Sequence, residues 1–139
     1  IYYSIQGNIL RPGEVVPNAV KAFLHTNGSI TDRVMAALET ADQYGGDSRC
    51  TCPALPADGS KPPVPCEGRT AYVAYILMAN KNDTNGDSHN NGKYAMYITV
   101  AQPDQTGPNV IKAGENMNPV KTLRMRYDAW RKTQPASFK

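Results

Sequence analysis

The sequence predicts an α+β fold, with one or two N-terminal helices packed on an antiparallel β-sheet of three to five strands. Three observations lead to this prediction. A capped, amphipathic helical pattern occupies the first third of the chain, a proline-rich segment with three cysteines follows it, and two runs rich in tyrosine and β-branched residues come next. A chain of 139 residues is long enough to bury a core in one domain.

The N-terminal part is expected to hold a strand and two helices. Residues 1–10 alternate loosely between apolar and polar side chains, as a strand does, whereas residues 18–26 carry an apolar stripe at helical spacing. A second helix is expected to start after Ser29, because Asp32 stands three residues later in a capping-box pattern. The paired glycines at 45–46 end this helix, which we expect to cover one face of the sheet.

A proline-rich loop with three cysteines follows the helices. Five prolines between residues 47 and 69 prevent regular hydrogen-bonded structure over most of this segment. A disulfide from Cys50 or Cys52 to Cys66 would close the loop, leaving the third cysteine as a free thiol or as the site of an intermolecular bond. The alternative is zinc bound by the three cysteines and a histidine, which is less favoured because the C-x-C spacing is tighter than usual.

The two most apolar runs of the chain, residues 70–79 and 94–101, are predicted to be the strands of an antiparallel hairpin. The polar residues 80–93 would form a long solvated loop between them. Within this loop, Asp83, Asn85 and Asp87 place oxygen atoms at alternate positions, as the start of a calcium loop does. The rest of an EF-hand pattern is missing, so calcium competes with an ordinary hairpin loop rich in asparagine, glycine and aspartate.

A further strand is predicted over residues 120–127. Leu123, Met125 and Tyr127 would lie on one face of it, with threonine and arginine on the other, as in a half-buried strand at the edge of a sheet. The remaining residues look like a tail anchored by Trp130. We therefore expect a single domain over residues 1–139, composed of a strand and helices (1–46), the cysteine loop (47–69), the antiparallel sheet (70–127) and the tail (128–139).

The first hairpin strand is apolar on both of its faces. Tyr72 and Ile76 would lie on one face, and Tyr75 and Leu77 on the other. An antiparallel strand normally keeps one face wet, so the second face needs cover from the same chain or from another subunit. On the second interpretation, Tyr72, Ile76 and Tyr97 belong to an interface, by self-association or with another protein.

Several features favour an exported protein, extracellular or periplasmic. Asn27 and Asn82 each begin an N-glycosylation triplet in a predicted turn. The chain begins at Ile1 without a methionine, which we interpret as a mature or trimmed product, and it contains no apolar run long enough to span a membrane.

The function expected from these patterns is a non-enzymatic structural or interaction subunit that assembles through exposed apolar strand surface. The order of helix, cysteine loop and antiparallel hairpin resembles the globular heads of pilin-type filament subunits, and this resemblance implies a surface filament. It carries over no residue, because the apolar N-terminal helix that defines those families is missing.

Two other function classes remain open. A secreted enzyme would build a cleft from the cysteine loop and residues 80–93, and it would depend on His25 or His89 as a base; no nucleophile motif accompanies either histidine. A nucleic-acid-binding virus coat protein would use the basic C-terminal segment, in which Tyr127 and Trp130 are interleaved with arginines and lysines. The net charge of +3 is too small to favour that partner by itself.

Overall fold

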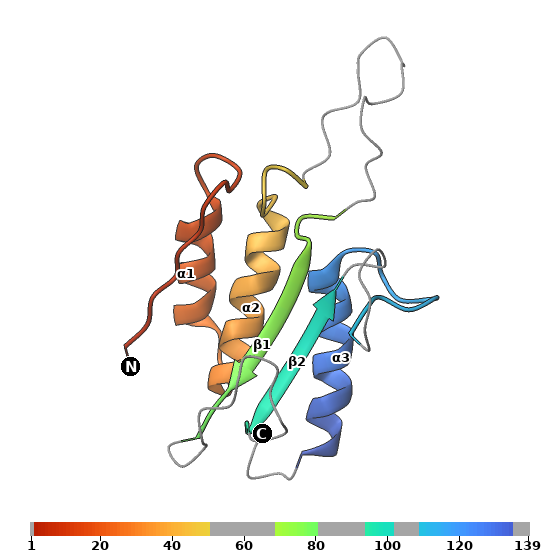
Figure 1. Ribbon diagram of the computed structural model, residues 1–139. Helices are drawn as coiled ribbons and strands as arrows, with labels where there is room; N and C mark the ends of the chain where they lie inside the picture. The colour runs from red at the N-terminus through yellow and green to blue at the C-terminus, as the bar shows by residue number, and fades with distance from the viewer. Residues whose placement is uncertain (1, 51–68, 81–93, 102–108, 135–139) are drawn as a thin grey trace.

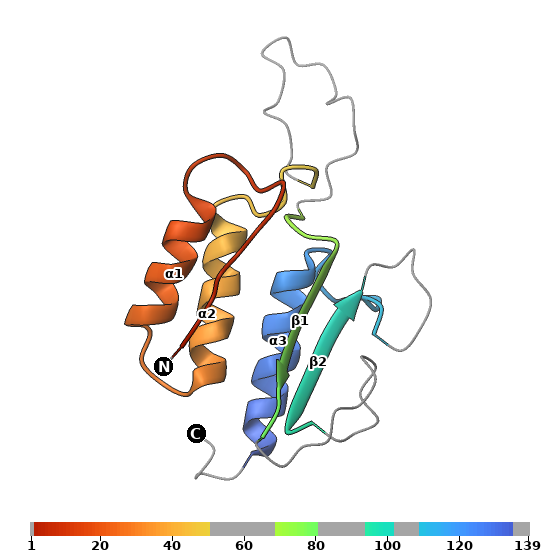
Figure 2. The same ribbon diagram turned by 60° about the vertical axis from the view of Figure 1, so that its left-hand side comes forward.

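The computed structural model describes residues 2–50, 69–80, 94–101 and 109–134 of the chain (Figure 1). Helices α1 and α2 form an antiparallel pair that lies beside a β-hairpin, and helix α3 lies against one face of that hairpin (Figures 1 and 2). The elements in chain order are α1 (Val15–His25), α2 (Ile30–Gln43), β1 (Val73–Met78), β2 (Met96–Ala101) and α3 (Pro119–Thr133).

The start of α2 has the predicted capping box. The backbone N–H of Asp32 donates to the side chain of Ser29 at 3.2 Å, and the backbone N–H of Ser29 donates to the carboxylate of Asp32 at 2.8 Å. Each residue thereby satisfies a backbone N–H that the first helical turn leaves without a partner. The helix ends at Gln43, and Gly45 and Gly46 follow it with positive φ, as the sequence predicts for the stop.

The hairpin pairs Val73 with Ala101 and Met78 with Met96 in a continuous antiparallel register. Successive side chains of each strand therefore point to opposite faces. One face, formed by Ala74 and Ile76 with their neighbours on β2, enters the main core. That core is completed by residues of α2, α3 and the segment before α3: Met35, Ile111, Val120, Leu123 and Tyr127.

The prediction of three to five strands is wrong for the part of the chain described, where the sheet has two strands. Residues 2–10 do not form a strand, and their one ladder contact is an isolated bridge between Leu10 and Asp47. Residues 120–127, also predicted as a strand, belong to α3. Asn118 caps this helix by accepting from the N–H of Val120 at 3.1 Å, and Pro119 occupies its first turn, where proline is tolerated.

The predicted tail likewise begins as helix, since α3 continues to Thr133. Trp130 does anchor this segment. Its ring lies 5.9 Å from that of Tyr127, centroid to centroid, and its side chain packs against the main core.

The prediction of a disulfide-stapled loop also needs correction. Cys50, the one cysteine among the described residues, is a free thiol. A backbone hydrogen bond from Cys50 to the carbonyl of Asp47, at 3.0 Å, closes a turn, and the thiol is hydrogen-bonded to the hydroxyl of Tyr72. Cys52 and Cys66 lie outside the described residues.

Candidate functional site

The face of the hairpin that points away from the core is apolar. On β1, Val73, Tyr75 and Leu77 are 43%, 60% and 41% exposed, and Tyr97 of β2 is half-buried beside them. The rings of Tyr75 and Tyr97 meet edge to face with centroids 6.4 Å apart, a geometry that aromatic pairs prefer. We call these four residues the outer face. In the part of the chain that the structure describes, no helix covers it (Figure 2).

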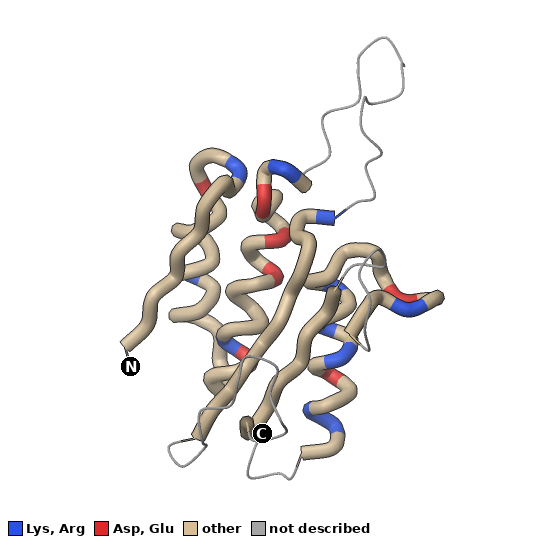
Figure 3. Tube along the Cα trace, viewed as in Figure 1, with Lys and Arg blue, Asp and Glu red and all other residues tan. Residues whose placement is uncertain are grey.

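The outer face continues onto the free edge of β1. Among the described residues, β1 pairs with β2 alone, so its other edge carries no ladder. A groove of about 670 Å³ runs along this edge between β1 and α2, and Val34, Leu38 and Ala41 of α2 form part of its wall. Both strands are free of charged side chains (Figure 3). The groove and the outer face together form a continuous, largely apolar surface.

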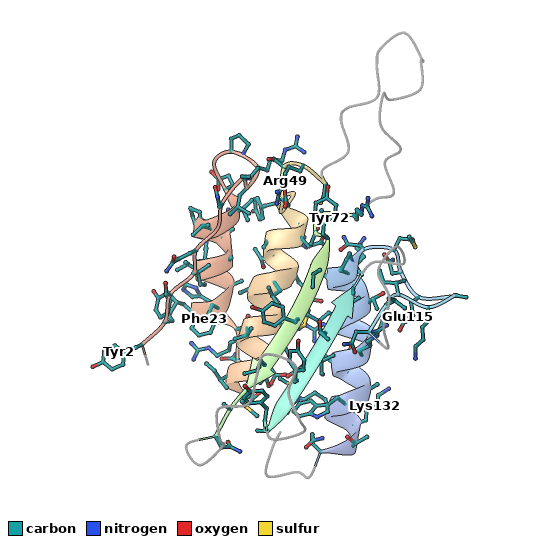
Figure 4. All side chains as sticks on the ribbon, viewed as in Figure 1. Tyr2, Phe23, Arg49, Tyr72, Glu115 and Lys132 are labelled. Atoms are coloured by element: carbon teal, nitrogen blue, oxygen red, sulfur yellow. The ribbon has the colours of Figure 1, made fainter. Side chains whose placement is uncertain are left out.

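A polar corner closes one end of this groove, where Arg49 and Tyr72 lie side by side (Figure 4). The guanidinium carbons of Arg49 and Arg69 lie 5.9 and 5.3 Å from the centre of the Tyr72 ring, within cation–π range. The hydrogen bond with Cys50 raises the pKa of Tyr72, and burial raises the pKa of the Cys50 thiol. The thiol is therefore protonated at neutral pH and is a poor nucleophile.

A second, more polar cleft of about 760 Å³ lies between α2 and α3. Asp42 accepts hydrogen bonds there from the hydroxyl of Thr70 and, at 2.6 Å, from the side-chain amide of Asn118. Beside them Arg124 makes a bidentate ion pair with Glu39, at 2.8 and 2.5 Å. These contacts join α2, the chain entering β1 and the start of α3. The polar groups that line the cleft thus bond to one another and hold these segments together, which is a structural role.

The surroundings of His25 do not support a role as a catalytic base. This residue ends α1, and its Nδ1 lies 2.8 Å from the carbonyl oxygen of Lys21, one turn earlier. The contact satisfies a carbonyl that the last helical turn leaves without a partner, as expected of a polar side chain at a helix end.

The structure separates the residues predicted to form an interface. Tyr97 lies on the outer face, Tyr72 lies at the polar corner and is 42% exposed, and Ile76 is 3% exposed in the core. Sequence reasoning did not assign Tyr75 and Leu77 to the interface, although they form most of the outer face. Both faces of β1 are apolar in the sequence, so no pattern within the strand identifies the covered one.

Asn27, a predicted glycosylation site, is exposed in the turn between α1 and α2. Within the described segments, no three His, Cys, Asp or Glu side chains are arranged to hold a metal ion, and no helix there is long and apolar enough to cross a membrane. The other predicted site residues lie outside the described residues: Cys52, Cys66, Asn82, Asp83, Asn85, Asp87 and His89.

Comparison with known proteins gives a match over the N-terminal part of the chain. Residues 1–55 match a protein family described as a family of unknown function (DUF1028). The matched segment contains α1 and α2 but neither strand of the hairpin. No curated protein and no solved structure matches the chain.

Proposed function

We propose that the chain is a non-enzymatic structural or interaction subunit that assembles with another protein subunit through the outer face. One observation carries the proposal: Val73, Tyr75 and Leu77 are exposed on one side of β1, while the alternate residues of the strand lie in the core. Single exposed apolar residues are common on protein surfaces, but a contiguous group of them is typical of an interface.

The energetics are adequate for association. Full burial of a leucine or valine side chain stabilises by about 1.5–3 kcal/mol, so Val73 and Leu77, each somewhat under half exposed, would contribute roughly 1 kcal/mol apiece. Tyr75 has more area to bury, and tyrosine is enriched in the cores of interfaces. We expect these apolar side chains to support an association whose extent rises with subunit concentration.

The more specific form of this proposal is an exported subunit of a surface filament, similar in outline to a pilin head. The exposure of Asn27 is compatible with export, because an N-glycosylation triplet is usable only at the surface. Mass spectrometry of the protein from its natural source tests this part: a glycan on Asn27 would support export, and an intracellular, unmodified protein would contradict it.

The pairing of arginines on α3 weakens the nucleic-acid alternative. Arg124 pairs with Glu39, Arg126 pairs with Glu115 at 2.6 Å, and Arg131 pairs with Asp32 at 2.9 Å. These carboxylates lie on α2 and on the segment before α3, whereas α3 itself carries one acidic residue, Asp128, among its basic ones (Figure 3). Guanidinium groups already held by carboxylates are poor ligands for phosphate.

The test is the assembly state of the full chain, measured by sedimentation velocity up to hundreds of micromolar, with negative-stain microscopy of the same samples. We expect concentration-dependent association that is lost in Tyr75→Lys/Leu77→Lys. The matched control is Met125→Lys, which places a lysine at another exposed apolar residue, 53% exposed on α3, and should associate like wild type. Circular dichroism of each variant checks that it is folded.

Two outcomes would contradict the proposal. In the first, the wild-type chain stays monomeric at the highest concentration. In the second, the outer-face variant and the Met125 control associate equally.

A further inference from the structure

We infer that the partner of the outer face is a second copy of this chain, and that two copies pair along the free edges of their β1 strands, antiparallel about a two-fold axis. This inference rests on the proposed function, because edge pairing places the two outer faces next to each other. It adds the identity of the partner and the mode of contact.

Among the described residues, the outer edge of β1 carries none of the usual protections against strand pairing. Natural edge strands are usually protected against pairing by a lysine, a proline, a bulge or a covering segment. Residues 71–80 contain no charge and no proline, and the register of β1 with β2 is continuous, without a bulge. A groove of about 670 Å³ with a largely apolar lining lies beside this edge. Edge pairing would extend the two-stranded sheet of each copy into one four-stranded sheet.

The absence of charged side chains on β1 favours a copy of the same chain as the partner. In an antiparallel β1–β1 pair, the uncharged strand of one copy faces the uncharged strand of the other, so no like charges meet. Three charged residues line the groove. Asp47 and Arg49 neutralise each other in an ion pair of 2.5 Å, and the carboxylate of Asp42 accepts hydrogen bonds from the side chains of Thr70 and Asn118. A strongly charged partner would find no complementary group along β1 (Figure 3).

A two-fold axis also suits the position of Tyr75. This residue lies next to the middle of β1, so the axis of an antiparallel β1–β1 pair would bring the two Tyr75 side chains close together on one face. Aromatic pairs across neighbouring strands stabilise sheets. The pair would extend the existing contact between Tyr75 and Tyr97 into a row of four rings.

The available area indicates a weak dimer. A tyrosine buries about 150–250 Å² in full, so Tyr75, at 60% exposure, would contribute roughly 100 Å² per copy. Val73, Leu77 and Tyr72 would each add less, which gives a total well below the roughly 800 Å² per partner of a standard interface. The main-chain hydrogen bonds of the paired edges would add to the binding free energy. We expect a dissociation constant in the micromolar range or weaker.

A charge exchange at Tyr75 tests the two-fold pairing. Tyr75→Lys alone and Tyr75→Glu alone each place like charges near the axis and should weaken self-association about tenfold or more. An equimolar mixture of the two variants should associate again, because each pair then holds opposite charges. The matched control is a mixture of Met125→Lys and Met125→Glu, which should sediment like wild type alone and mixed.

Amide hydrogen exchange, followed by NMR on dilute and concentrated samples of the full chain, tests the edge itself. Edge pairing should slow the exchange of alternate amides of β1, those that point away from β2, as concentration rises. Packing of outer faces without edge pairing would leave these amides unchanged.

The outcomes separate this inference from the proposed function. Restored association in the mixture together with slowed exchange supports edge pairing. Wild-type association without either result overturns edge pairing and leaves the proposed function standing. A wild-type chain that is monomeric at every concentration overturns both.

Discussion

The hydroxyl of Tyr127 on α3 donates a hydrogen bond of 2.6 Å to Oδ1 of Asp32, in the first turn of α2. Oδ2 of the same carboxylate accepts from Arg131 at 2.9 Å and from the backbone N–H of Ser29 at 2.8 Å. One carboxylate therefore caps α2 and docks α3 on it. Tyr127 is 1% exposed, so its hydroxyl has no access to water as an alternative partner.

We expect Tyr127→Phe to destabilise the protein by about 1–2 kcal/mol, because the change removes a buried hydrogen bond to a charged group and leaves Thr31, 2.9 Å from the same hydroxyl, with one contact fewer. Urea unfolding measures this loss. Tyr75→Phe, which removes an exposed hydroxyl, is the control and should stay within about 0.5 kcal/mol of wild type. Equal losses in the two variants would contradict the role assigned to Tyr127.

The carboxylate of Asp32 should make the free energy of unfolding depend on pH in the acidic range. Burial alone would raise the pKa of Asp32, but the hydrogen bonds from Tyr127 and Ser29 and the charge of Arg131 outweigh it, so the folded state lowers this pKa. A carboxylate with a lowered pKa stabilises fully above its ordinary value near 3.8 and loses that contribution as the pH falls through its folded value.

Stability measured by urea unfolding between about pH 5 and pH 2 should accordingly fall less steeply in Asp32→Asn than in wild type. Some slope should remain in the variant, because the hydrogen bonds from Arg126 also lower the pKa of Glu115. Parallel curves for the two proteins would show that Asp32 titrates alike in the folded and unfolded states.

Arg126 holds several backbone carbonyls with one side chain. Its guanidinium donates to the carbonyl oxygens of Thr99 and Asn109 at 3.0 Å and of Val110 at 2.9 Å, and it pairs with Glu115. Since lysine cannot reproduce this planar fork, we expect Arg126→Lys to cost about 2 kcal/mol in thermal or urea unfolding.

A matched control for Arg126 is Lys132→Ala, which removes an exposed cation from the same helix and should cost less than about 0.5 kcal/mol. If Arg126→Lys were as mild as this control, the contacts to the carbonyls would have no net stabilising effect.

Two glycines with positive φ should respond differently to alanine. At Gly46 a Cβ would lie 2.4 Å from the backbone oxygen of Thr70, whereas at Gly13 it would meet no atom within 4 Å. Gly13→Ala should cost about 1–2 kcal/mol from backbone strain alone, and Gly46→Ala about 3 kcal/mol or more, because the chain entering β1 must also move. Thermal unfolding of both variants measures the difference, and similar losses would contradict the close approach at Gly46.

The sequence was sufficient for α2 and the hairpin because their signals are local. Ser29 and Asp32 form a capping box wherever the helix packs, and the two runs of the hairpin are rich in residues suited to a strand. The strand predicted over residues 120–127 was wrong because alternation over so few residues also fits a helix. Met125 decides the matter: a strand would bury it with Leu123 and Tyr127, but it is 53% exposed while they are buried.

The sequence predicted that β1 has an apolar face in need of a partner, but it did not predict which face. The apolar character of both faces of β1 indicated that one face needs a partner, and this much is visible in the sequence. Which face that is depends on where α3 docks, and α3 was assigned to the sheet itself. The expected interface residue Ile76 consequently lies in the core, whereas Tyr75 lies on the outer face.

The docking of α3 also bears on how the chain folds. Thr31 and Tyr127, which lie in contact, are 96 residues apart in the chain, whereas α1 and α2 are neighbours joined by a short turn. Contacts of such long range form late, because a large loop must close first. Until α3 arrives, the hairpin exposes both of its apolar faces. We therefore expect the refolding yield to depend on a competition between docking of α3 and aggregation of uncovered hairpins, and to fall as the protein concentration rises.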